Sequence, residues 1–292
     1  MFRLNIGERT KGILLVLLAG ASWGVISLFV RHLGAAGIDA KSIAALRSFM
    51  AVLMLLVIMP FVSPGALKIR LRDAWCFAGT GIASITFFNA LYFNTMQRTS
   101  VGIAVVLLYT SPIFVTMMSC FFFKEKFKIS KLFALLLVTA GCFLVSGVMK
   151  EGNANLPLSV LFMGIGSGFC YALFSIFGRF AQQRGYGSDT ITLWSFIFAS
   201  LTSPFLLDWG VAPKVVQSPG LLLCLAGLAA ISTILPYFAY TAGLKRLQPS
   251  TAAIAATIEP VVGTLVGIII FGEVLTFSSL AGMCLILVAI LL

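Results

Sequence analysis

The sequence predicts an all-α integral membrane protein with ten transmembrane helices in a 5+5 inverted repeat. Three observations predict this fold: the composition, a series of long apolar stretches, and a similarity between the two halves of the chain. Of the 292 residues, 60% are hydrophobic and 10% are charged, and the mean hydropathy is +1.08. Soluble domains carry about a quarter charged residues, so much of this surface must face lipid.

Ten apolar stretches follow one another, and each is near the roughly 20 residues that a membrane-crossing helix needs. They are 12–32, 41–61, 73–95, 100–122, 131–148, 157–182, 189–207, 220–243, 250–271 and 276–292. The stretches are too long for membrane β-strands and do not alternate. The first is not a signal peptide, because it has no small-residue cleavage site and nine more follow. The last stretch ends abruptly, so one possibility is that the chain is a trimmed version of a longer protein.

The net charge of +11 is informative through its placement. With the N-terminus in the cytoplasm, the cytoplasmic segments hold fourteen of the 20 Lys and Arg residues, the opposite side holds five, and Arg47 lies inside a span. Basic residues concentrate in cytoplasmic loops, so both termini are expected on the cytoplasmic side of the inner (cytoplasmic) membrane. The basic excess thus reflects topology and does not indicate a nucleic-acid partner.

The six cysteines all fall within apolar stretches and form no CxxC pair. This arrangement suggests neither a metal site nor a disulfide framework, and we expect no cofactor.

The two halves of the chain, 1–148 and 149–292, align without a gap when the sequence is shifted by 148 positions. The matched pairs include Arg31 with Arg179, Arg98 with Arg246, Pro112 with Pro260, and Glu125 with Glu273. Each half contains five spans, an odd number, so the second half enters the membrane from the opposite side. Inverted repeats of this kind are typical of secondary transporters that work by alternating access.

Several short motifs resemble a known family. They are GASWG at 20–24, TSP at 110–112, RLQP at 246–249, IEPV at 258–261 and FGE at 271–273. Together they resemble the EamA branch of the drug/metabolite transporter superfamily, over essentially the whole chain. The resemblance implies ten helices in a 5+5 inverted arrangement with cytoplasmic termini. It also implies transport of small metabolites, frequently amino-acid export.

Glu259 is the most informative polar residue, because it stands beside Pro260 inside an apolar stretch. Proline removes a helical hydrogen bond, and in lipid such a break must line a cavity. Pro112 is the matching break in the first half. Glu259 could bind an ammonium group of the substrate, exchange a proton during the cycle, or form a structural hydrogen bond between helices. Its mate is Ser111, so the repeat alone does not require the acid.

Arg47 lies about one and a half turns into the second span, where an unpaired guanidinium is unfavourable. We favour a side chain that reaches the outer surface or contacts a helix end. The alternative is an anion partner, either Glu259 or a substrate carboxylate, in which case Arg47 and Glu259 would suit a zwitterion.

Aromatic and amide residues complete the candidate binding site. They are Trp23, Tyr171, Asn89, Tyr109, Tyr237 and Tyr240. Trp23 and Tyr171 are matched between the halves, and the family resemblance places their helices around a central cavity. Aromatic faces there could hold apolar groups or ammonium groups by cation–π attraction. Packing between helices is the simpler alternative.

The favoured interpretation is a secondary carrier for a small polar or amphipathic metabolite. Its partners are that small molecule, the lipid bilayer and, in one version, protons; a monomer and a homodimer both remain open. A passive channel or lipid-handling protein is the alternative. A membrane-embedded enzyme is disfavoured, because the sequence shows no polar catalytic cluster or nucleotide-binding motif.

Overall fold

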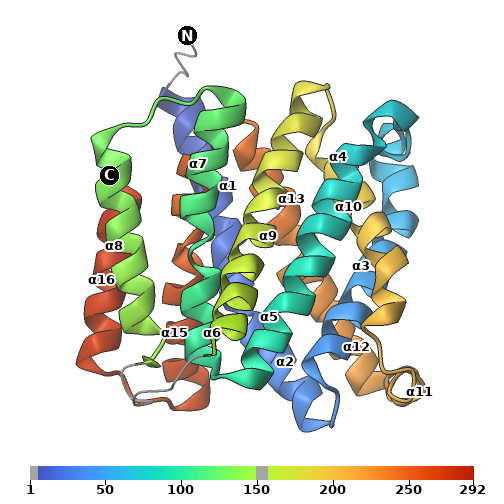
Figure 1. Cartoon of the computed structure of the whole chain (residues 1–292). Coiled ribbons are helices and arrows are strands. Elements are labelled where there is room, and N and C mark those ends of the chain that lie inside the picture. Colours follow the sequence, from blue (N-terminus) through green and yellow to red (C-terminus); the bar gives the residue numbers. More distant parts are fainter. Residues whose placement is uncertain (1–5, 149–156) are drawn as a thin grey trace.

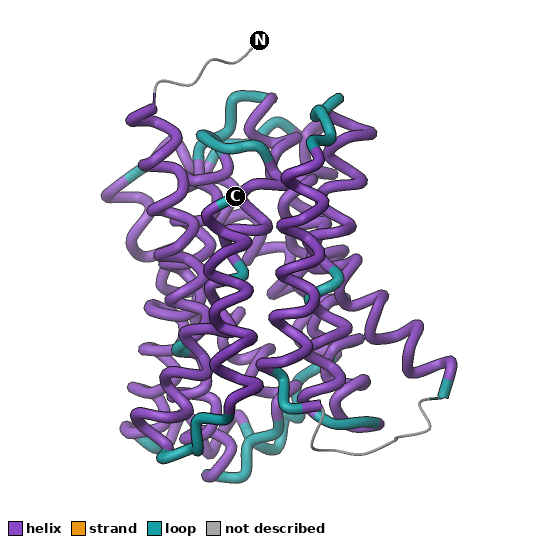
Figure 2. The backbone as a smooth tube through the Cα atoms, turned by 90° about the vertical axis from the view of Figure 1, so that its left-hand side faces the viewer, coloured by secondary structure: helices purple, strands orange, loops and turns teal. Residues whose placement is uncertain are grey.

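The structure is a computed structural model that describes residues 6–148 and 157–292. In these two ranges the chain forms helices and loops and no strand (Figure 1). The longer helices run roughly side by side, and most loops gather at the two ends of the bundle (Figure 2). The prediction of an all-α membrane fold is confirmed.

Seven helical segments within the described ranges are long and apolar enough to cross a membrane. They are Ile6–Ala35, Ala40–Val62, Leu71–Arg98, Val101–Phe123, Leu158–Gln183, Pro219–Leu244 and Pro249–Phe271. The predicted spans 131–148 and 276–292 correspond to two shorter apolar helices, Ile129–Val145 and Phe277–Leu291. The predicted span 189–207 corresponds to a helix over Ser188–Thr202 and a 3₁₀ turn over Ser203–Phe205.

The first half contains the α-helices α1 to α8. They are α1 (Ile6–Gly24), α2 (Ile26–Ala35), α3 (Ala40–Val62), α4 (Ala74–Ala78), α5 (Phe87–Arg98), α6 (Val101–Leu108), α7 (Ser111–Phe123) and α8 (Ile129–Val145). Short 3₁₀ turns η1 (Pro64–Leu67) and η2 (Leu71–Asp73) lie between α3 and α4, and the π-helical segment η3 (Gly79–Thr86) joins α4 to α5.

The second half contains α9 to α16. They are α9 (Leu158–Gln183), α10 (Ser188–Thr202), α11 (Ala212–Gln217), α12 (Pro219–Ala229), α13 (Leu235–Leu244), α14 (Pro249–Ala256), α15 (Ile258–Phe271) and α16 (Phe277–Leu291). The 3₁₀ turn η5 (Ser203–Phe205) follows α10, and the π-helical segment η6 (Ala230–Ile234) joins α12 to α13.

Helix boundaries in the two halves coincide at the spacing of 148 residues. α6 and α14 match at both ends, and α3 and α10, α5 and α13, and α8 and α16 begin at matched positions. The ends of α7 and α15 also match, because each is followed by a left-handed residue, Lys124 (φ 51°) and Gly272 (φ 67°). The same local backbone signals therefore recur in both halves.

Polar residues at the helix starts explain several of these boundaries. Asp39 accepts hydrogen bonds from the backbone N–H groups of Lys41 and Ser42 before the first turn of α3. Ser218 and Thr276 cap α12 and α16 in the same manner. Such caps satisfy N–H groups that have no partner within the helix.

The first predicted span differs from the structure in one respect. The sequence predicts a continuous helix over 12–32, but the helix is interrupted at Val25, between α1 and α2. Val25 still donates its N–H to Ala21 O at 3.2 Å, so the interruption is local.

The helices pack so that the two halves share contacts throughout the bundle. α1 contacts α13, α14 and α15, and α9 contacts α5, α6 and α7. α8 and α16 pack against each other at one edge, on the left in Figure 1. Many large apolar side chains, such as Phe121, Phe162 and Ile269, remain exposed on the outside, as expected for a surface in lipid.

Candidate functional site

Glu259 lies in the first turn of α15, directly after a break in the helical segment. Thr257 at this break donates its hydroxyl to Ile254 O at 2.6 Å and its backbone N–H to the same oxygen at 3.1 Å. Pro260 has no N–H, so the carbonyl of Ala256 loses its usual helical donor. The break therefore places polar backbone and a carboxyl side chain inside an apolar segment.

A matching break separates α6 from α7 in the first half, at Tyr109 and Thr110. The Thr110 hydroxyl donates to Leu107 O at 2.7 Å. Pro112 likewise leaves the carbonyl of Leu108 without its helical donor. The two proline-containing segments therefore interrupt their helices in the same way.

Each break packs against a glycine of the other half. A Cβ placed on Gly20 of α1 would lie 2.7 Å from the Ala256 carbonyl oxygen, and a Cβ on Gly168 of α9 would lie 2.9 Å from the Leu108 carbonyl oxygen. Gly20 and Gly168 are themselves related by the spacing of 148. The missing side chains allow these helices to approach the carbonyls that the prolines release.

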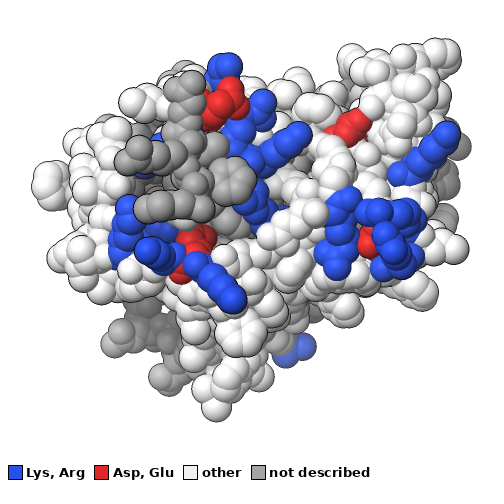
Figure 3. Space-filling model, turned by 90° about the horizontal axis from the view of Figure 1, so that it is seen from above, with Lys and Arg blue, Asp and Glu red and all other residues white. Residues whose placement is uncertain are grey.

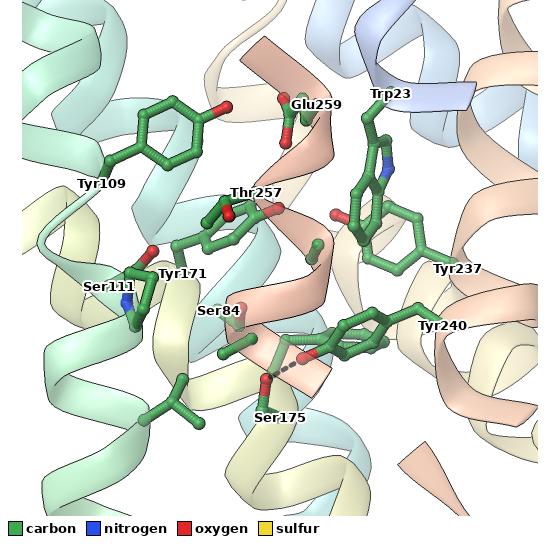
Figure 4. Close-up of a pocket in the computed structure, with 15 residues that line it drawn as sticks. Trp23, Ser84, Tyr109, Ser111, Tyr171, Ser175, Tyr237, Tyr240, Thr257 and Glu259 are labelled. Carbon is green, nitrogen blue, oxygen red and sulfur yellow. Dashed lines mark hydrogen bonds between the residues drawn. The ribbon is translucent and has the colours of Figure 1, made fainter. Parts of the chain in front are cut away.

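A small pocket of about 30 Å³ lies between the two breaks (Figure 4). Its lining residues are Trp23, Ser84, Tyr109, Ser111, Pro112, Val115, Tyr171, Phe174, Ser175, Tyr237, Tyr240, Ala253, Ala256, Thr257 and Glu259. The hydroxyl groups of Tyr109 and Tyr171 point toward the Glu259 carboxyl group and interact with it. The carboxyl group is therefore surrounded by phenol groups from both halves.

Trp23 lies at the centre of a group of aromatic rings. Its ring centroid is 6.3 Å from that of Tyr171, 5.4 Å from that of Tyr237 and 5.7 Å from that of Tyr240. The Tyr240 hydroxyl is 2.6 Å from the Ser175 hydroxyl, which fixes the orientation of this phenol. Such a group of aromatic faces beside a carboxylate can hold an ammonium group.

A larger cavity of about 330 Å³ adjoins the small pocket. Trp23, Tyr171, Tyr237 and Glu259 line both and form the wall between them. The remaining walls come from α2, the first two turns of α3, α5 and the ends of α6, which lie in the lower half of Figure 1. These walls are mostly apolar, with Arg47 and Asn89 as the main polar groups.

Arg47 is buried, with 8% of its surface exposed, and lines this larger cavity. Its guanidinium donates to Asn89 Oδ1 at 3.5 Å, and Asn89 in turn donates to Ile85 O at 2.7 Å. The first part of the favoured expectation, that Arg47 reaches the outer surface, is therefore wrong, and the contact that Arg47 makes is with Asn89 in the first turn of α5. Packing of the side chain between α3 and α5 holds it toward the same cavity as Glu259.

Comparison with known proteins identifies the chain. The model of the EamA-like transporter family matches it twice, over residues 10–147 and 158–292. The chain belongs to the EamA-like transporter family.

Several relatives support this membership. An uncharacterized transporter of Archaeoglobus fulgidus is 30% identical over 95% of this chain and 94% of its own length. The threonine/homoserine exporter RhtA of Escherichia coli K12 is 27% identical over 82% of this chain and 76% of its own. A crystal structure of a protein at 16% identity has the same fold, with a TM-score of 0.81 over 96% of this chain and 95% of its own. The chain is therefore a multi-pass membrane transporter.

The structure brings most of the predicted site residues of this EamA-like transporter together. Those around the small pocket are Trp23, Tyr109, Pro112, Tyr171, Tyr237, Tyr240 and Glu259, and those in the larger cavity include Arg47 and Asn89. Pro260 lies beside them, next to Glu259. Their roles in binding or gating remain predictions.

The sequence analysis missed four polar residues that line the small pocket of the EamA-like fold. They are Ser84, Ser111, Ser175 and Thr257. Matched serines were a usable signal, because the shift of 148 places Ser84 over Ser232 and Ser27 over Ser175. Within the residues that the structure describes, no group of three or more His, Cys, Asp or Glu side chains could hold a metal ion.

Proposed function

We propose that this EamA-like protein is a secondary carrier that exports a small polar or amphipathic metabolite, an amino acid or a related compound, across the cytoplasmic membrane. The observation that carries the proposal is the small pocket between two matched broken helices and the larger cavity beside it, which share Glu259 and aromatic rings in their walls. Half-helices that meet at the middle of the membrane are where transporters bind substrates. The name of RhtA supports an amino acid as substrate.

The proposal includes ten transmembrane helices in two inverted halves, 1–148 and 149–292, with both termini in the cytoplasm. The coincident helix boundaries and the two matches of one family model support two related halves. Lys and Arg side chains gather on the face where α1 begins, and α16 ends toward the same side (Figure 3). A basic face of this kind favours the cytoplasmic side.

Alternating access requires contacts that differ between the two ends of the bundle, and the matched arginines provide them. At the lower end, Arg31 of α2 forms an ion pair with Glu273 after α15, and its guanidinium lies 4.0 Å from the centroid of the Phe271 ring. Arg31 and Glu273 come from different halves, and both are about half exposed.

The matched residues at the upper end do not form the same pair. Glu125 after α7 binds Lys131 and Ser250 instead, and its Oε2 atom is buried with no partner in the described chain. Arg179 of α9 donates to Leu244 O at 3.0 Å, within electrostatic reach of Glu125.

If the halves exchange conformations during transport, these contacts exchange too. Arg179 then moves to the free oxygen of Glu125 as the upper end opens, and Arg31 leaves Glu273 as the lower end closes. In this proposal the present structure is assigned to the state in which the larger cavity opens to the lower, non-cytoplasmic side, because α2, the start of α3 and α5 line that cavity. The two Arg–Glu pairs thus stabilise opposite states.

Removing each arginine is therefore expected to shift the conformational equilibrium in opposite directions. In a cysteine-free background with Ala44→Cys in the larger cavity, Arg31→Leu should slow labelling by an impermeant maleimide added from outside. Arg179→Leu should accelerate it. The expected changes are about two- to fivefold each, because partly exposed ion pairs contribute up to about 1 kcal/mol. Changes in the same direction for both variants would contradict the exchange.

Trp23→Ala is expected to weaken substrate binding while the protein stays folded. The indole contacts three tyrosine rings and lines both cavities. Its loss removes an aromatic wall, worth about 1 kcal/mol or more, and so raises the dissociation constant about five- to tenfold. Isothermal titration with a transported substrate measures this. An unchanged isotherm would assign Trp23 to packing alone.

Counterflow in proteoliposomes tests the proposed function. Vesicles preloaded with a substrate panel of amino acids, nucleosides, sugars and organic cations should accumulate trace radiolabelled substrate transiently and saturably for at least one class. A passive channel would instead give flux that does not saturate and shows no counterflow.

A further inference from the structure

We propose that Arg47 and Asn89 form a carboxylate subsite, so that the carrier selects zwitterions over amines of the same shape. This inference rests on the proposed function, because it assigns a second recognition element to the same cavity. Glu259 and the aromatic rings would hold the ammonium group, and Arg47 would hold the acid group. The two elements together define the substrate as a compact molecule with both charges.

The first reason is that Arg47 lacks a charged partner. Its side chain is almost fully buried and its Nε atom has no hydrogen-bond partner. Across residues 6–148 and 157–292 the guanidinium takes part in no ion pair, and Asn89 Oδ1, at 3.5 Å, is its single hydrogen-bond acceptor. A buried guanidinium normally pairs with a carboxylate or with several acceptors. This guanidinium therefore keeps hydrogen-bond donors that the chain does not pair, on a side chain that lines the larger cavity.

The second reason is the surroundings of Arg47. Arg47 lines a cavity whose walls are formed mostly by apolar side chains, among them Ile43, Phe88, Phe93 and Met96. In such a poorly hydrated space the electrostatic attraction between a carboxylate and a guanidinium is stronger than it is in water. Arginine also presents two parallel N–H groups that match the two oxygens of a carboxylate.

The third reason is the position of Asn89. Its amide group donates to Ile85 O at 2.7 Å, which points its oxygen at Arg47. Asn89 therefore orients the guanidinium without neutralising it. An aspartate at this position would compete with a substrate carboxylate, whereas the asparagine leaves the positive charge available.

The fourth reason is that the same cavity holds the complementary charge. Glu259 lines this cavity together with Trp23, Tyr171 and Tyr237, and Arg47 is within electrostatic range of Glu259 without forming an ion pair with it. A molecule between them can satisfy both groups at once. A simple amine would leave the guanidinium unpaired, and a simple acid would leave the carboxylate unpaired.

The test compares matched ligands as competitors and as counterflow substrates. Threonine, homoserine, valine, leucine and phenylalanine are each assayed beside their carboxamide and their decarboxylated amine. The wild-type protein should prefer at least one amino acid over both of its analogues by about 30-fold or more, the size expected for a buried charged contact. Arg47→Gln should reduce this preference to within about threefold, because it should weaken binding of the amino acid and leave binding of the amine unchanged.

Two further variants separate recognition from structure. Asn89→Asp keeps a partner beside Arg47 but supplies an internal carboxylate, so it should also lose the preference for the amino acid. Lys41→Gln removes a positive charge from the same helix outside this subsite and should leave the preference unchanged. Circular dichroism and size-exclusion elution of each variant check that the fold is intact.

The outcomes distinguish this inference from the proposed function. Saturable counterflow of the amine or carboxamide equal to that of the amino acid would overturn the subsite and leave the carrier intact. A preference that survives in Arg47→Gln would also overturn it. Counterflow of a nucleoside, sugar or organic cation without counterflow of any amino acid would overturn the subsite alone. Absence of counterflow with these compounds and with the nucleosides, sugars and organic cations would overturn both, because the carrier itself would then be wrong.

Discussion

Glu259→Gln is expected to reduce counterflow about 100-fold while the protein remains folded. Glutamine is nearly isosteric and can still accept hydrogen bonds from the Tyr109 and Tyr171 hydroxyl groups, so the packing of the pocket is preserved. The charge that attracts an ammonium group is lost, and a buried charged contact of this kind contributes about 2–3 kcal/mol. Initial rates in proteoliposomes at equal protein content measure the loss.

The control for this variant is Asp208→Asn, which removes a carboxylate from an exposed loop and should leave the rates unchanged. Two assays separate the roles of the acid. If exchange of substrate survives in Glu259→Gln but uptake driven by a pH gradient is lost, Glu259 couples transport to protons. If both are lost, it binds substrate. Normal exchange together with a normal response to the pH gradient would show that Glu259 neither binds substrate nor couples transport to protons.

Gly168→Ala is expected to destabilise the protein by about 1–3 kcal/mol, because overpacking against a rigid backbone cannot be relieved. The new Cβ would lie 2.5 Å from the Thr110 hydroxyl oxygen and 2.9 Å from the carbonyl oxygens of Leu107 and Leu108. These atoms belong to the break before α7, so the break must shift and the pocket with it. We therefore expect slower counterflow in addition to a lower melting temperature.

Gly166→Ala provides the matched control two residues earlier on α9. There the nearest atom to a new Cβ is Leu91 Cδ1 at 3.4 Å, the end of a flexible side chain. Alanine also has the higher helix propensity, so this variant should be neutral or slightly stabilising. Equal melting temperatures for Gly168→Ala and Gly166→Ala would show that the contact with the break carries no energetic weight.

Much of the fold is predictable from the sequence, because lipid imposes a simple requirement on it. Each crossing needs a long apolar segment, and the segments are visible in the hydropathy alone. The breaks near Pro112 and Pro260 are also predictable, since proline cannot donate to the helix. The spacing of 148 further predicts which residues of the two halves occupy equivalent places, and the helix boundaries follow it.

Other features depend on contacts that form only in the folded protein. The π-helical segments η3 and η6 are examples, in which Thr86 and Thr233 donate their hydroxyls to carbonyls five residues earlier, at Gly81 and Leu228. Nothing in the residue pattern distinguishes such a wide turn from an ordinary one. The interruption at Val25 is similar, because it contains no proline.

In the candidate site, too, some features are predictable from the sequence and others depend on contacts in the folded protein. Glu259 and its aromatic neighbours stand out in the sequence because acidic and matched aromatic residues are conspicuous in apolar spans. The orientation of Arg47 cannot be predicted from the sequence, because a long side chain near a helix end can turn to water or to the interior. The serines of the pocket are equally hard to recognise, since a hydroxyl inside a membrane helix usually bonds its own backbone.

The opposite formal charges of Arg47 and Glu259 on the walls of one cavity have an electrical consequence. An empty carrier and a carrier loaded with a zwitterion have the same net charge, so the membrane voltage does no work on the difference between them. If Glu259 carries a proton while the site changes sides, the net charge differs by one unit. Moving that charge fully across the membrane is worth about 2.3 kcal/mol per 100 mV. The current measured across a voltage-clamped bilayer would therefore report the movement of protons and would not report the movement of the zwitterionic substrate.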